Sequence, residues 1–435
     1  MPLYSDTSAR TPHPLTERAI AAKRAARVVG SLPTSAKNAV LLALASTLDQ
    51  PDTVSRLLAA NAADLSAARA ANLPAPKLAR LELTAKSIAQ LAIGLRQVAA
   101  LADPIGRVTL DRPATGPDAA PSGLHIRKVR APLGVIAMIY EARPGVTIDA
   151  FSLCFKSGNC CILRGGKEAQ HSNAALASLI HEALSAHDLP QAALINLSGT
   201  SREDLAHLLT LDQHIDLVIP RGGKDLIELV CRTSRIPTVQ HYQGVCHIFV
   251  DESADIESAI NICATAKTSA PATCNALECI LVHRNIADAF VPRMLARFAA
   301  LHVEVRGTPV IAALGPVTPA QPSDFGHEFL DLIIAMRTVD SVDEAIDHIA
   351  TYGSNHTDAI LTSDTAPGGA ADRFIAAVRS SCVLVNASTR FNDGFQLGLG
   401  AEIGISTSRV HAYGVMGLEE LTTQRWIAIG SGQTR

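Results

Sequence analysis

The sequence of 435 residues lacks the features that mark several large classes of protein. No apolar stretch approaches the length of a membrane span. Residues 1–7 show no basic region followed by an apolar one, so no secretory signal is visible. The formal net charge of -3 gives no reason to expect a nucleic acid or an anionic membrane as a partner. We therefore expect a cytoplasmic protein.

The nine cysteines do not form a disulfide framework. Their count is odd, they are scattered along the chain, and Cys160 and Cys161 are adjacent. Reduced thiols, as in a cytoplasmic protein, fit this pattern better. Cys246, His247, Cys274 and Cys279 offer soft metal ligands, but no CxxC or HxxxH spacing occurs anywhere. We expect no metal site.

The length and the composition, 48% hydrophobic and 18% charged, predict a protein of two or three domains with ample core. Residues from about 15 to 102 are rich in alanine and leucine and predict several amphipathic helices, separated at Pro33, Pro51, Pro74 and Pro76. Residues 103–122 are rich in proline and glycine, which predicts a projecting hairpin or linker.

Apolar strands then alternate with amphipathic helices, which predicts parallel sheets covered on both faces. We expect strands at 134–140, 160–164, 193–197 and 215–220, and helices at 147–156, 168–186, 202–209 and 224–233. The second half repeats the pattern, with strands at 245–250, 279–283, 332–339, 359–362 and 382–386, and helices at 256–267, 287–301, 342–352 and 370–380.

The two alternating halves predict two α/β domains with doubly wound parallel sheets. We assign residues 1–103 and 124–245 to a dinucleotide-binding domain that includes the N-terminal helices, and residues 246–393 to a catalytic domain. Residues 104–123 and 394–435 are interpreted as a small extension that forms an oligomer.

Two glycine turns follow predicted strands: Arg164-Gly165-Gly166-Lys167 and Arg221-Gly222-Gly223-Lys224. Unpaired backbone amides and the helix dipole make such turns anion sites. The GxGxxG dinucleotide fingerprint is absent, so two tight turns with solvated cations are the simpler alternative. The repetition of the pattern after two parallel strands favours phosphate binding.

Cys274 is the best candidate for a nucleophile. It lies in a small polar loop marked by Pro271, and the apolar run 279–283 that follows predicts a buried strand. A thiol on a loop against a rigid strand can reach a substrate, whereas most cysteines are packed inside and inert. Apolar surroundings predict burial for Cys154, Cys160, Cys161, Cys263, Cys279 and Cys382, and leave Cys246 undecided.

Motifs in a fixed order from about Arg130 to the end of the chain resemble those of the gamma-glutamyl phosphate reductase (glutamate-5-semialdehyde dehydrogenase) family, a branch of the aldehyde dehydrogenase superfamily. They lie at 140–150, 216–227, 244–255, 268–278, 328–332, 356–360, 385–391, 398–407 and 416–423. The combination is specific, whereas the helical first hundred residues match less well. The resemblance implies an aldehyde-dehydrogenase-like fold.

The resemblance also implies an activity. Members of this family reduce L-glutamyl 5-phosphate to glutamate 5-semialdehyde in proline biosynthesis, with NADPH as cofactor. Aligned with the superfamily, Arg164 falls on a lysine that contacts the adenine ribose, and Lys167 falls on a glutamate found in members that prefer NAD. A cation there would attract a 2′-phosphate, so we expect NADP(H). Arg221, Gly222 and Gly223 are expected near the pyrophosphate. Glutamate 5-kinase is the partner that this reaction suggests.

Further roles follow from the same alignment. Glu328 aligns with the glutamate that holds the nicotinamide ribose, although a solvated carboxylate is the commoner fate of glutamate. Asn275 and Arg390 are expected to bind substrate, the arginine through the glutamyl α-carboxylate, and Asp393 through the α-ammonium group. Solvated loop charges are nearly as good an explanation for Arg390 and Asp393.

A comparison with hydrolytic aldehyde dehydrogenases concerns Arg143. Their water-activating glutamate would fall near residues 240–244, where no Asp or Glu occurs, and their oxyanion-stabilising asparagine would fall near Arg143. We expect Arg143 to contact the acyl phosphate, with a surface ion pair to Glu141 as the alternative. The rival functions are another acylating aldehyde dehydrogenase, or a silent NADP-binding member of the family.

Overall fold

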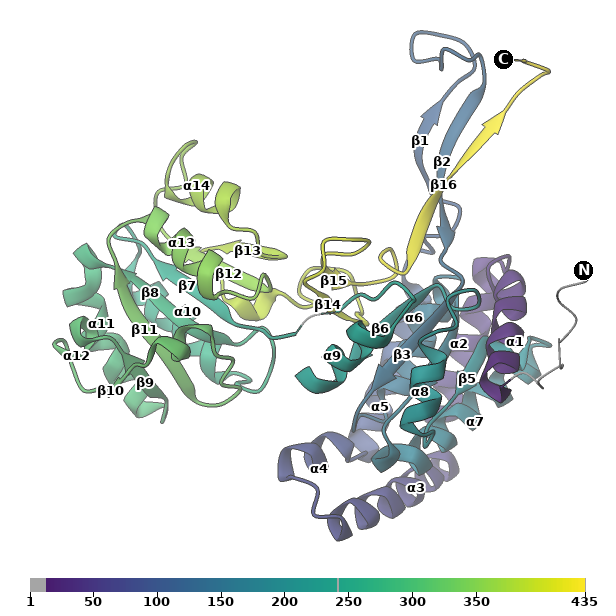
Figure 1. Ribbon diagram of the computed structural model, residues 1–435, viewed down its shortest axis with the longest axis horizontal. Helices are drawn as coiled ribbons and strands as arrows, with labels where there is room; N and C mark the ends of the chain where they lie inside the picture. Colours follow the sequence, from purple (N-terminus) through teal and green to yellow (C-terminus); the bar gives the residue numbers. More distant parts are fainter. Residues whose placement is uncertain (1–12, 241, 435) are drawn as a thin grey trace, which may run out of the picture. The chain divides into compact units, whose positions relative to one another are not determined.

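The computed structural model describes residues 13–240 and 242–434, which form two compact units (Figure 1). The first unit ends at Val239 and resumes at Gly417, and the second unit runs from Gln240 to Met416. Residues 1–7, on which the expected lack of a secretory signal rests, lie outside the described residues. No single helix in the described part is long and apolar enough to cross a membrane. The helices α1 (Pro14–Val29) and α2 (Thr34–Leu48) reach the required length and apolar composition only when taken together, and they are bent by 119° at their junction.

The first unit begins with the helices expected from the alanine-rich segment, and proline sets their starts. Pro33 precedes α2, Pro51 opens α3, and Pro74 precedes α4. A proline is tolerated there because its missing N–H has no helical partner in the first turn. The helices are α1 (Pro14–Val29), α2 (Thr34–Leu48), α3 (Pro51–Ala70), α4 (Ala75–Leu81) and α5 (Ala85–Ala100).

A four-stranded parallel sheet with the order β5-β4-β3-β6 is the centre of this unit. Its strands are β3 (Val135–Tyr140), β4 (Cys160–Arg164), β5 (Leu194–Asn196) and β6 (Leu217–Arg221). The helices between them are α6 (Val146–Lys156), α7 (Gln170–Ala186, after the 3-10 turn Lys167–Ala169) and α8 (Arg202–Leu208), and α9 (Lys224–Thr233) follows. The chain winds outward from β3 to β5 and then returns to β6, so right-handed crossovers place helices on both faces.

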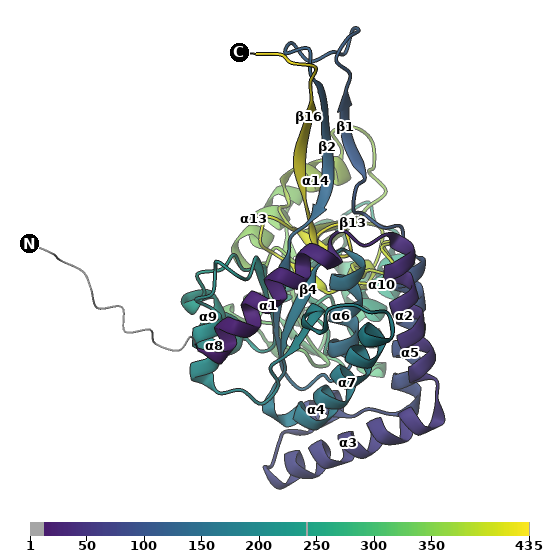
Figure 2. The ribbon, with the colours of Figure 1, turned by 90° about the vertical axis from the view of Figure 1, so that its right-hand side faces the viewer.

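A three-stranded antiparallel ribbon with the order β1-β2-β16 extends from this unit (Figures 1 and 2). Its strands are β1 (Val108–Arg112), β2 (His125–Pro132) and β16 (Thr422–Ile429). The hairpin predicted within residues 103–122 supplies β1, and the amphipathic end of the chain supplies β16. The side chain of Asn159 donates to the carbonyl of Leu421 at 2.8 Å, which holds the returning chain against the unit.

The second unit contains a seven-stranded parallel sheet with the order β10-β9-β11-β8-β7-β12-β13. Its strands are β7 (Cys246–Val250), β8 (Leu277–His283), β9 (Glu304–Gly307), β10 (Thr318–Pro319), β11 (Ile333–Val339), β12 (Thr357–Leu361) and β13 (Cys382–Val385). The predicted strands are all present, and β9 and β10 extend the sheet at one edge. The α/β class with parallel sheets is confirmed.

Helices cover both faces of this sheet and bury two apolar layers. The layer that includes Ile260, Phe290 and Phe298 lies under α10 (Ile256–Thr268) and α11 (Arg284–Ala300). The other layer, which includes Phe249 and Phe374, lies under α13 (Val342–Tyr352) and α14 (Ala370–Ala377). The remaining short elements are α12 (Pro309–Ala312), two 3-10 turns (Pro322–Gly326 and Thr389–Phe391) and the β14–β15 hairpin (Gly404–Ser406 with Gly414–Met416).

The unit boundaries differ from the sequence-based domains in two respects. Gln240 and residues 242–245 were assigned to the dinucleotide-binding domain, and residues 394–416 to the oligomer-forming tail, but both belong to the second unit. There the backbone N–H of Thr407 donates to the carbonyl of Gln240. The other sequence-based ranges, and the oligomeric role of the extension, stay predictions.

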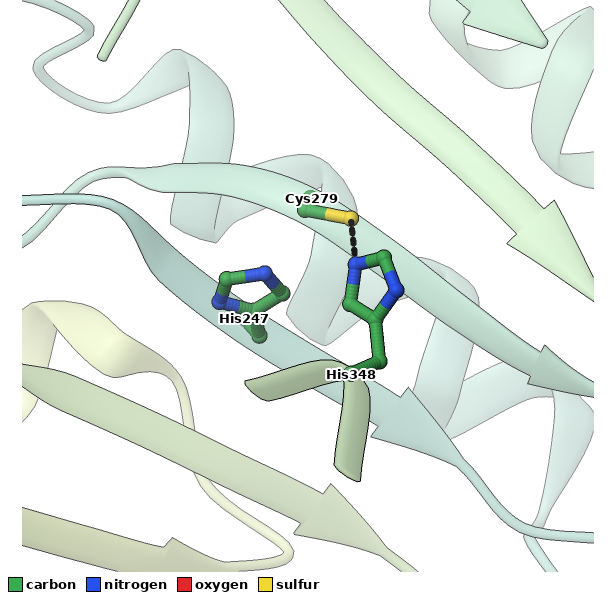
Figure 3. A group of neighbouring side chains, drawn as sticks. All are labelled: His247, Cys279 and His348. Carbon is green, nitrogen blue, oxygen red and sulfur yellow. Dashed lines mark hydrogen bonds between the residues drawn. The ribbon is translucent and has the colours of Figure 1, made fainter. Parts of the chain in front are cut away.

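Beneath α13, three polar side chains meet on the same face of the sheet (Figure 3). His247 of β7 and Cys279 of β8 are register partners, and His348 of α13 covers them. The Nδ1 atom of His247 lies 3.2 Å from the carboxylate of Asp358, and the Nε2 atom of His348 lies 3.9 Å from the Cys279 sulfur. All four side chains are buried.

These contacts separate the proton affinities of the two imidazoles. Burial alone would lower the pKa of His247, but the Cys279 sulfur and the Asp358 carboxylate raise it to about 10. Burial, the neighbouring His247 and the Arg337 guanidinium lower the pKa of His348 to about 3. Between these two pKa values, His247 is cationic and His348 is neutral in the folded protein. In an unfolded chain both histidines would lose their positive charge near pH 6.5.

This difference predicts that the cluster stabilises the second unit most near pH 6.5. Below pH 6.5 these two histidines bind more protons in the unfolded chain than in the folded one, so the free energy of unfolding falls as the pH falls. Above pH 6.5 they bind more protons in the folded chain, so the free energy of unfolding falls as the pH rises. In His348→Gln the loss of unfolding free energy between pH 6.5 and 5.5 should be about 1 kcal/mol smaller than in the wild type. Urea unfolding followed by circular dichroism measures these free energies, and an equal loss in wild type and variant over this pH range would contradict the prediction.

Candidate active site

Three strand ends meet at one edge of the first unit's sheet. Strands β3, β4 and β6 run parallel, with β3 between the other two, so their carboxyl ends lie side by side. The chain turns to one side after β3 and arrives on the other side at β6, which makes this the topological switch point where parallel sheets bind ligands. The turns that follow these strands hold Arg143, Arg164 to Lys167, and Arg221 to Lys224.

Two carboxylates connect these turns. The Glu168 carboxylate accepts the backbone N–H of Ala142 at 2.7 Å, which ties the turn after β4 to the turn after β3. The Glu141 carboxylate lies 3.4 Å from the backbone nitrogen of Gly223 and so approaches the turn after β6. Ala142 has a φ of 40°, in the left-handed region that non-glycine residues rarely adopt. The turn that exposes Arg143 is therefore held in a specific shape.

The turn after β4 suits a phosphate-bearing ligand. A side chain at Gly165 would lie 2.1 Å from Nδ2 of Asn173, so only glycine fits there. The Arg164 Nη2 donates to the carbonyl of Thr200 at 3.3 Å, but its buried Nε has no hydrogen-bond partner among the described residues. Lys167 is exposed. A guanidinium with spare donors beside an exposed ammonium group matches an anionic nucleotide.

The turn after β6 leaves its backbone open. Gly222 and Gly223 are exposed, and α9 begins at Lys224 with no side-chain cap hydrogen bond, so the first N–H groups of this helix have no intrahelical acceptor. Arg221 is half-buried at the end of β6, and Lys224 lies 3.9 Å from Glu228. The first unit thus brings the two predicted phosphate-binding turns to one sheet edge, whereas the predicted cofactor residue Glu328 lies in the second unit. Whether they bind the nucleotide stays a prediction.

In the second unit, Cys274 lies in the loop between α10 and β8 and is half-buried. Six other cysteines are buried, five of them as predicted: Cys154, Cys160, Cys161, Cys263 and Cys279, together with Cys246. The prediction was wrong for Cys382, which is half-buried because it lies on the edge strand β13. Cys231, on α9, is half-buried as well.

The backbone of Cys274 is fixed from two directions. A Cβ atom at Gly244 would lie 1.9 Å from the carbonyl oxygen of Cys274, so the two segments pack with no room for a side chain. The Cys246 thiol, on the strand that follows Gly244, donates to the same carbonyl with a sulfur–oxygen distance of 3.3 Å. This close packing holds the loop that carries Cys274 against the sheet.

The expected substrate residues lie around this loop and are engaged in it. Arg390 Nη1 donates to Oγ1 of Thr273 at 2.7 Å, and its buried Nε has no partner among the described residues. Asn275 is buried and donates to the carbonyl of Asn392 at 3.0 Å. Asp393 accepts the backbone N–H of Phe395 at 3.0 Å. Arg390 thus contacts the residue before Cys274, and Asn275 contacts the residue before Asp393. Their binding of substrate stays a prediction.

Glu328 lies near the same loop, in the segment before β11. Its carboxylate accepts the backbone N–H of Gly244 at 2.9 Å. Burial raises its pKa, although the Gly244 N–H and the Lys267 ammonium lower it. A half-buried carboxylate that is anchored through one oxygen keeps acceptor capacity for a ligand hydroxyl.

Sequence reasoning missed a buried ion pair beside Glu328. Lys267 on α10 lies 2.7 Å from Glu278 on β8, and both side chains are fully buried. A signal was available, because an acidic residue within the apolar run of β8 must be paired. Burial raises the pKa of Glu278 to about 7, although Lys267 lowers it, and burial lowers the pKa of Lys267.

The cluster under α13 is the one arrangement among the described residues that offers three metal-ligand atoms within 4.8 Å of one another. Nη1 of Arg337 lies 3.4 Å from Nδ1 of His348. A guanidinium only donates, so Nδ1 accepts and Nε2 of the neutral ring carries the proton. That tautomer, and the positive charge of Arg337, oppose a cation beside Cys279. The expectation of no metal site stays a prediction.

Comparisons with known proteins cover nearly the whole chain. The profile of the aldehyde dehydrogenase family matches residues 7–335. The gamma-glutamyl phosphate reductase of Xanthomonas campestris is 48% identical over 418 residues, which are 96% of this chain and 98% of that protein. The crystal structure of gamma-glutamyl phosphate reductase from Thermotoga maritima has a TM-score of 0.92 at 40% identity and covers 97% of this chain and 99% of that one.

A more distant structure resembles the chain in fold alone. An engineered glycolyl-CoA reductase with bound NADP⁺ is 16% identical with a TM-score of 0.64, over 94% of this chain and 95% of that one. The aldehyde-dehydrogenase-like fold expected from the motifs is thus confirmed by near and distant structures. Because relatives of nearly half identity match from end to end, the chain belongs to the aldehyde dehydrogenase family and, within it, to the gamma-glutamyl phosphate reductases.

Proposed function

We propose that the chain reduces L-glutamyl 5-phosphate to L-glutamate 5-semialdehyde and phosphate with NADPH, as a step of proline biosynthesis from glutamate. The observation that carries this proposal is Cys274, a half-buried thiol on a loop whose backbone is packed against Gly244. Its thiolate would attack the acyl carbon, the carbon–oxygen bond to phosphate would break, and phosphate would leave with the electron pair. This step gives a thioester on the protein.

A nicotinamide cofactor, which family membership supports, supplies the hydride for the second step when bound. The thioester carbon accepts the hydride, and the tetrahedral oxyanion collapses with cleavage of the carbon–sulfur bond. The aldehyde is released and the Cys274 thiolate is regenerated, so the enzyme returns to its starting state. Arg164 to Lys167 and Arg221 to Gly223 would hold the nucleotide phosphates, and Glu328 would hold the nicotinamide ribose.

The choice of an acyl phosphate over hydrolysis rests on two features. No Asp or Glu occurs at residues 240–244, so no carboxylate there can bring water to the thioester. Arg143 is exposed in the constrained turn after β3, where a guanidinium can bind phosphate oxygens. Arg390, Asp393 and Asn275 are proposed to bind the glutamyl group. Another acylating aldehyde dehydrogenase activity is the competing proposal.

We further propose that the chain acts in the cytoplasm as a homo-oligomer, and that glutamate 5-kinase passes it the unstable acyl phosphate. The three-stranded ribbon supports an oligomer because Trp426 is 61% exposed and Ile429 is 52% exposed on its edge strand. Light scattering of the wild type and of a Trp426→Ser variant tests this part of the proposal. A monomeric wild type would remove its support.

Replacement of the nucleophile tests the central step. Cys274→Ser should lower phosphate-dependent oxidation of glutamate 5-semialdehyde with NADP⁺ by at least about 10³-fold, because a hydroxyl is a far weaker nucleophile than a thiolate. Cys382→Ser, a change at another half-buried cysteine, should keep the wild-type rate. Similar losses in the two variants would argue against Cys274, and rapid alkylation of Cys274 alone would support it.

The cofactor preference is expected to depend on the exposed Lys167. Lys167→Glu replaces a cation with an anion and should lower the ratio of kcat/KM for NADP⁺ to that for NAD⁺ by about tenfold or more. Lys224→Glu, in the other turn, is the matched control and should change the ratio less. Steady-state rates with both nucleotides measure it, and an unchanged ratio for Lys167→Glu would show that the assignment is wrong.

The role of Arg143 separates phosphate chemistry from cofactor binding. Arg143→Ala should lower the phosphate-dependent rate by about 10- to 100-fold, since a charge-assisted hydrogen bond is worth about 1.5–3 kcal/mol. The dissociation constant for NADP⁺, measured by fluorescence titration, should change little. Equal losses in rate and in cofactor affinity would instead indicate that Arg143 only maintains the turn.

A further inference from the structure

The buried pair of Lys267 and Glu278 takes no part in the proposed chemistry, yet it lies where charge is costly. Both side chains are fully buried, and the ammonium lies 2.7 Å from one carboxylate oxygen. Burial of an ion pair seldom adds net stability over apolar residues of the same size. A buried pair next to a candidate site therefore calls for a reason beyond folding.

The second carboxylate oxygen of Glu278 points to such a reason. It accepts the backbone N–H of Leu330 at 3.2 Å. Leu330 has a φ of 55°, a left-handed conformation that costs energy in a residue with a branched side chain. The hydrogen bond from Leu330 to Glu278 thus holds a strained turn two residues after Glu328, whose own carboxylate accepts the backbone N–H of Gly244.

The charge of Lys267 acts on Glu328 as well. Its ammonium counters the burial that would otherwise favour the protonated form of Glu328, and the Gly244 N–H acts in the same sense. Glu278, Asp331 and the Cys246 thiol raise the pKa of Lys267 in turn, against the effect of its burial. Lys267 is therefore the cation that several acidic groups share, Glu328 included.

Resting on the function proposed above, we infer that Lys267 and Glu278 are positioning residues that hold Glu328 in place and keep its carboxylate ionised to accept the hydroxyl groups of the nicotinamide ribose. Neither residue needs to contact the nucleotide or the sulfur. Glu278 fixes the turn at Leu330, and Lys267 supplies the opposing charge. The pair therefore governs the affinity for the cofactor through Glu328.

The double variant Lys267→Met with Glu278→Gln tests this inference by removing both charges together, so that no lone charge stays buried. The glutamine oxygen can still accept from Leu330. The dissociation constant for NADPH, followed by nucleotide fluorescence, should rise about tenfold at pH 7. The loss of NADPH affinity relative to wild type should grow towards pH 6. It should shrink towards pH 9, because at that pH Glu328 loses its proton without the help of Lys267.

A second buried pair provides the control. Lys37 and Asp103 form an ion pair in the first unit with side chains 1% and 9% exposed, whereas Glu328 belongs to the second unit. Lys37→Met with Asp103→Asn should lower the thermal midpoint and leave the NADPH dissociation constant and its pH dependence as in wild type. Should the first double variant not fold, Lys267→Met alone should still weaken NADPH binding at least about threefold. It removes the charge that opposes the effect of burial on Glu328, and Glu278, whose pKa burial raises to about 7, can take up a proton.

Wild-type affinity with a wild-type pH dependence in a folded Lys267→Met, Glu278→Gln variant overturns the inference. The same holds for Lys267→Met if it is the variant that folds. A wild-type protein that binds neither NADPH nor NADH would overturn the proposed function itself, which is a different result. Binding is measured without turnover, so a wrong choice of acyl substrate does not affect the outcome.

Discussion

The common direction of the strands in each large sheet is the constraint on which the rest of the structure depends. Because β3, β4 and β6 run parallel, the turns that carry Arg143, Lys167 and Arg221 all emerge at one edge. The reversal of chain progression around β3 leaves helices on both faces and an open edge between them. Residues far apart in the sequence thereby form one candidate anion site without a dedicated fingerprint motif.

Buried polar groups then fix the loops that the sheets bring together. In the first unit, Glu168 joins the turn after β4 to the turn after β3. In the second, Glu328 holds Gly244, whose backbone packs on Cys274, and Arg390 holds Thr273. Unpaired polar groups in such places would be costly, so each loop has few alternative conformations. Loop shape in this protein is set by carboxylates and arginines more than by apolar contacts.

The sequence predicted the regular elements well because their periodicity is strong. The expected helix at 342–352 matches α13, and the expected strand at 160–164 matches β4. The short strand β9, with charged Glu304 and Arg306 in alternation, gives no apolar signal, and it was missed. The pairing of Lys267 with Glu278 depends on two residues from different elements meeting in space. No local pattern encodes that meeting, although an acidic residue in an apolar strand could have raised the question.

The discontinuity of the first unit has a consequence for the newly made chain. Strand β16 pairs with β2 along its whole length, and Asn159 binds the carbonyl of Leu421, so this unit is complete only after β16 has left the ribosome. The second unit is continuous from Gln240 to Met416 and has all its strands by then. Until β16 is made, one edge of β2 has open backbone hydrogen-bonding groups, and such an edge is prone to aggregation. The three-stranded ribbon is thus completed after both sheets have been made, and β2 has an unpaired edge until then.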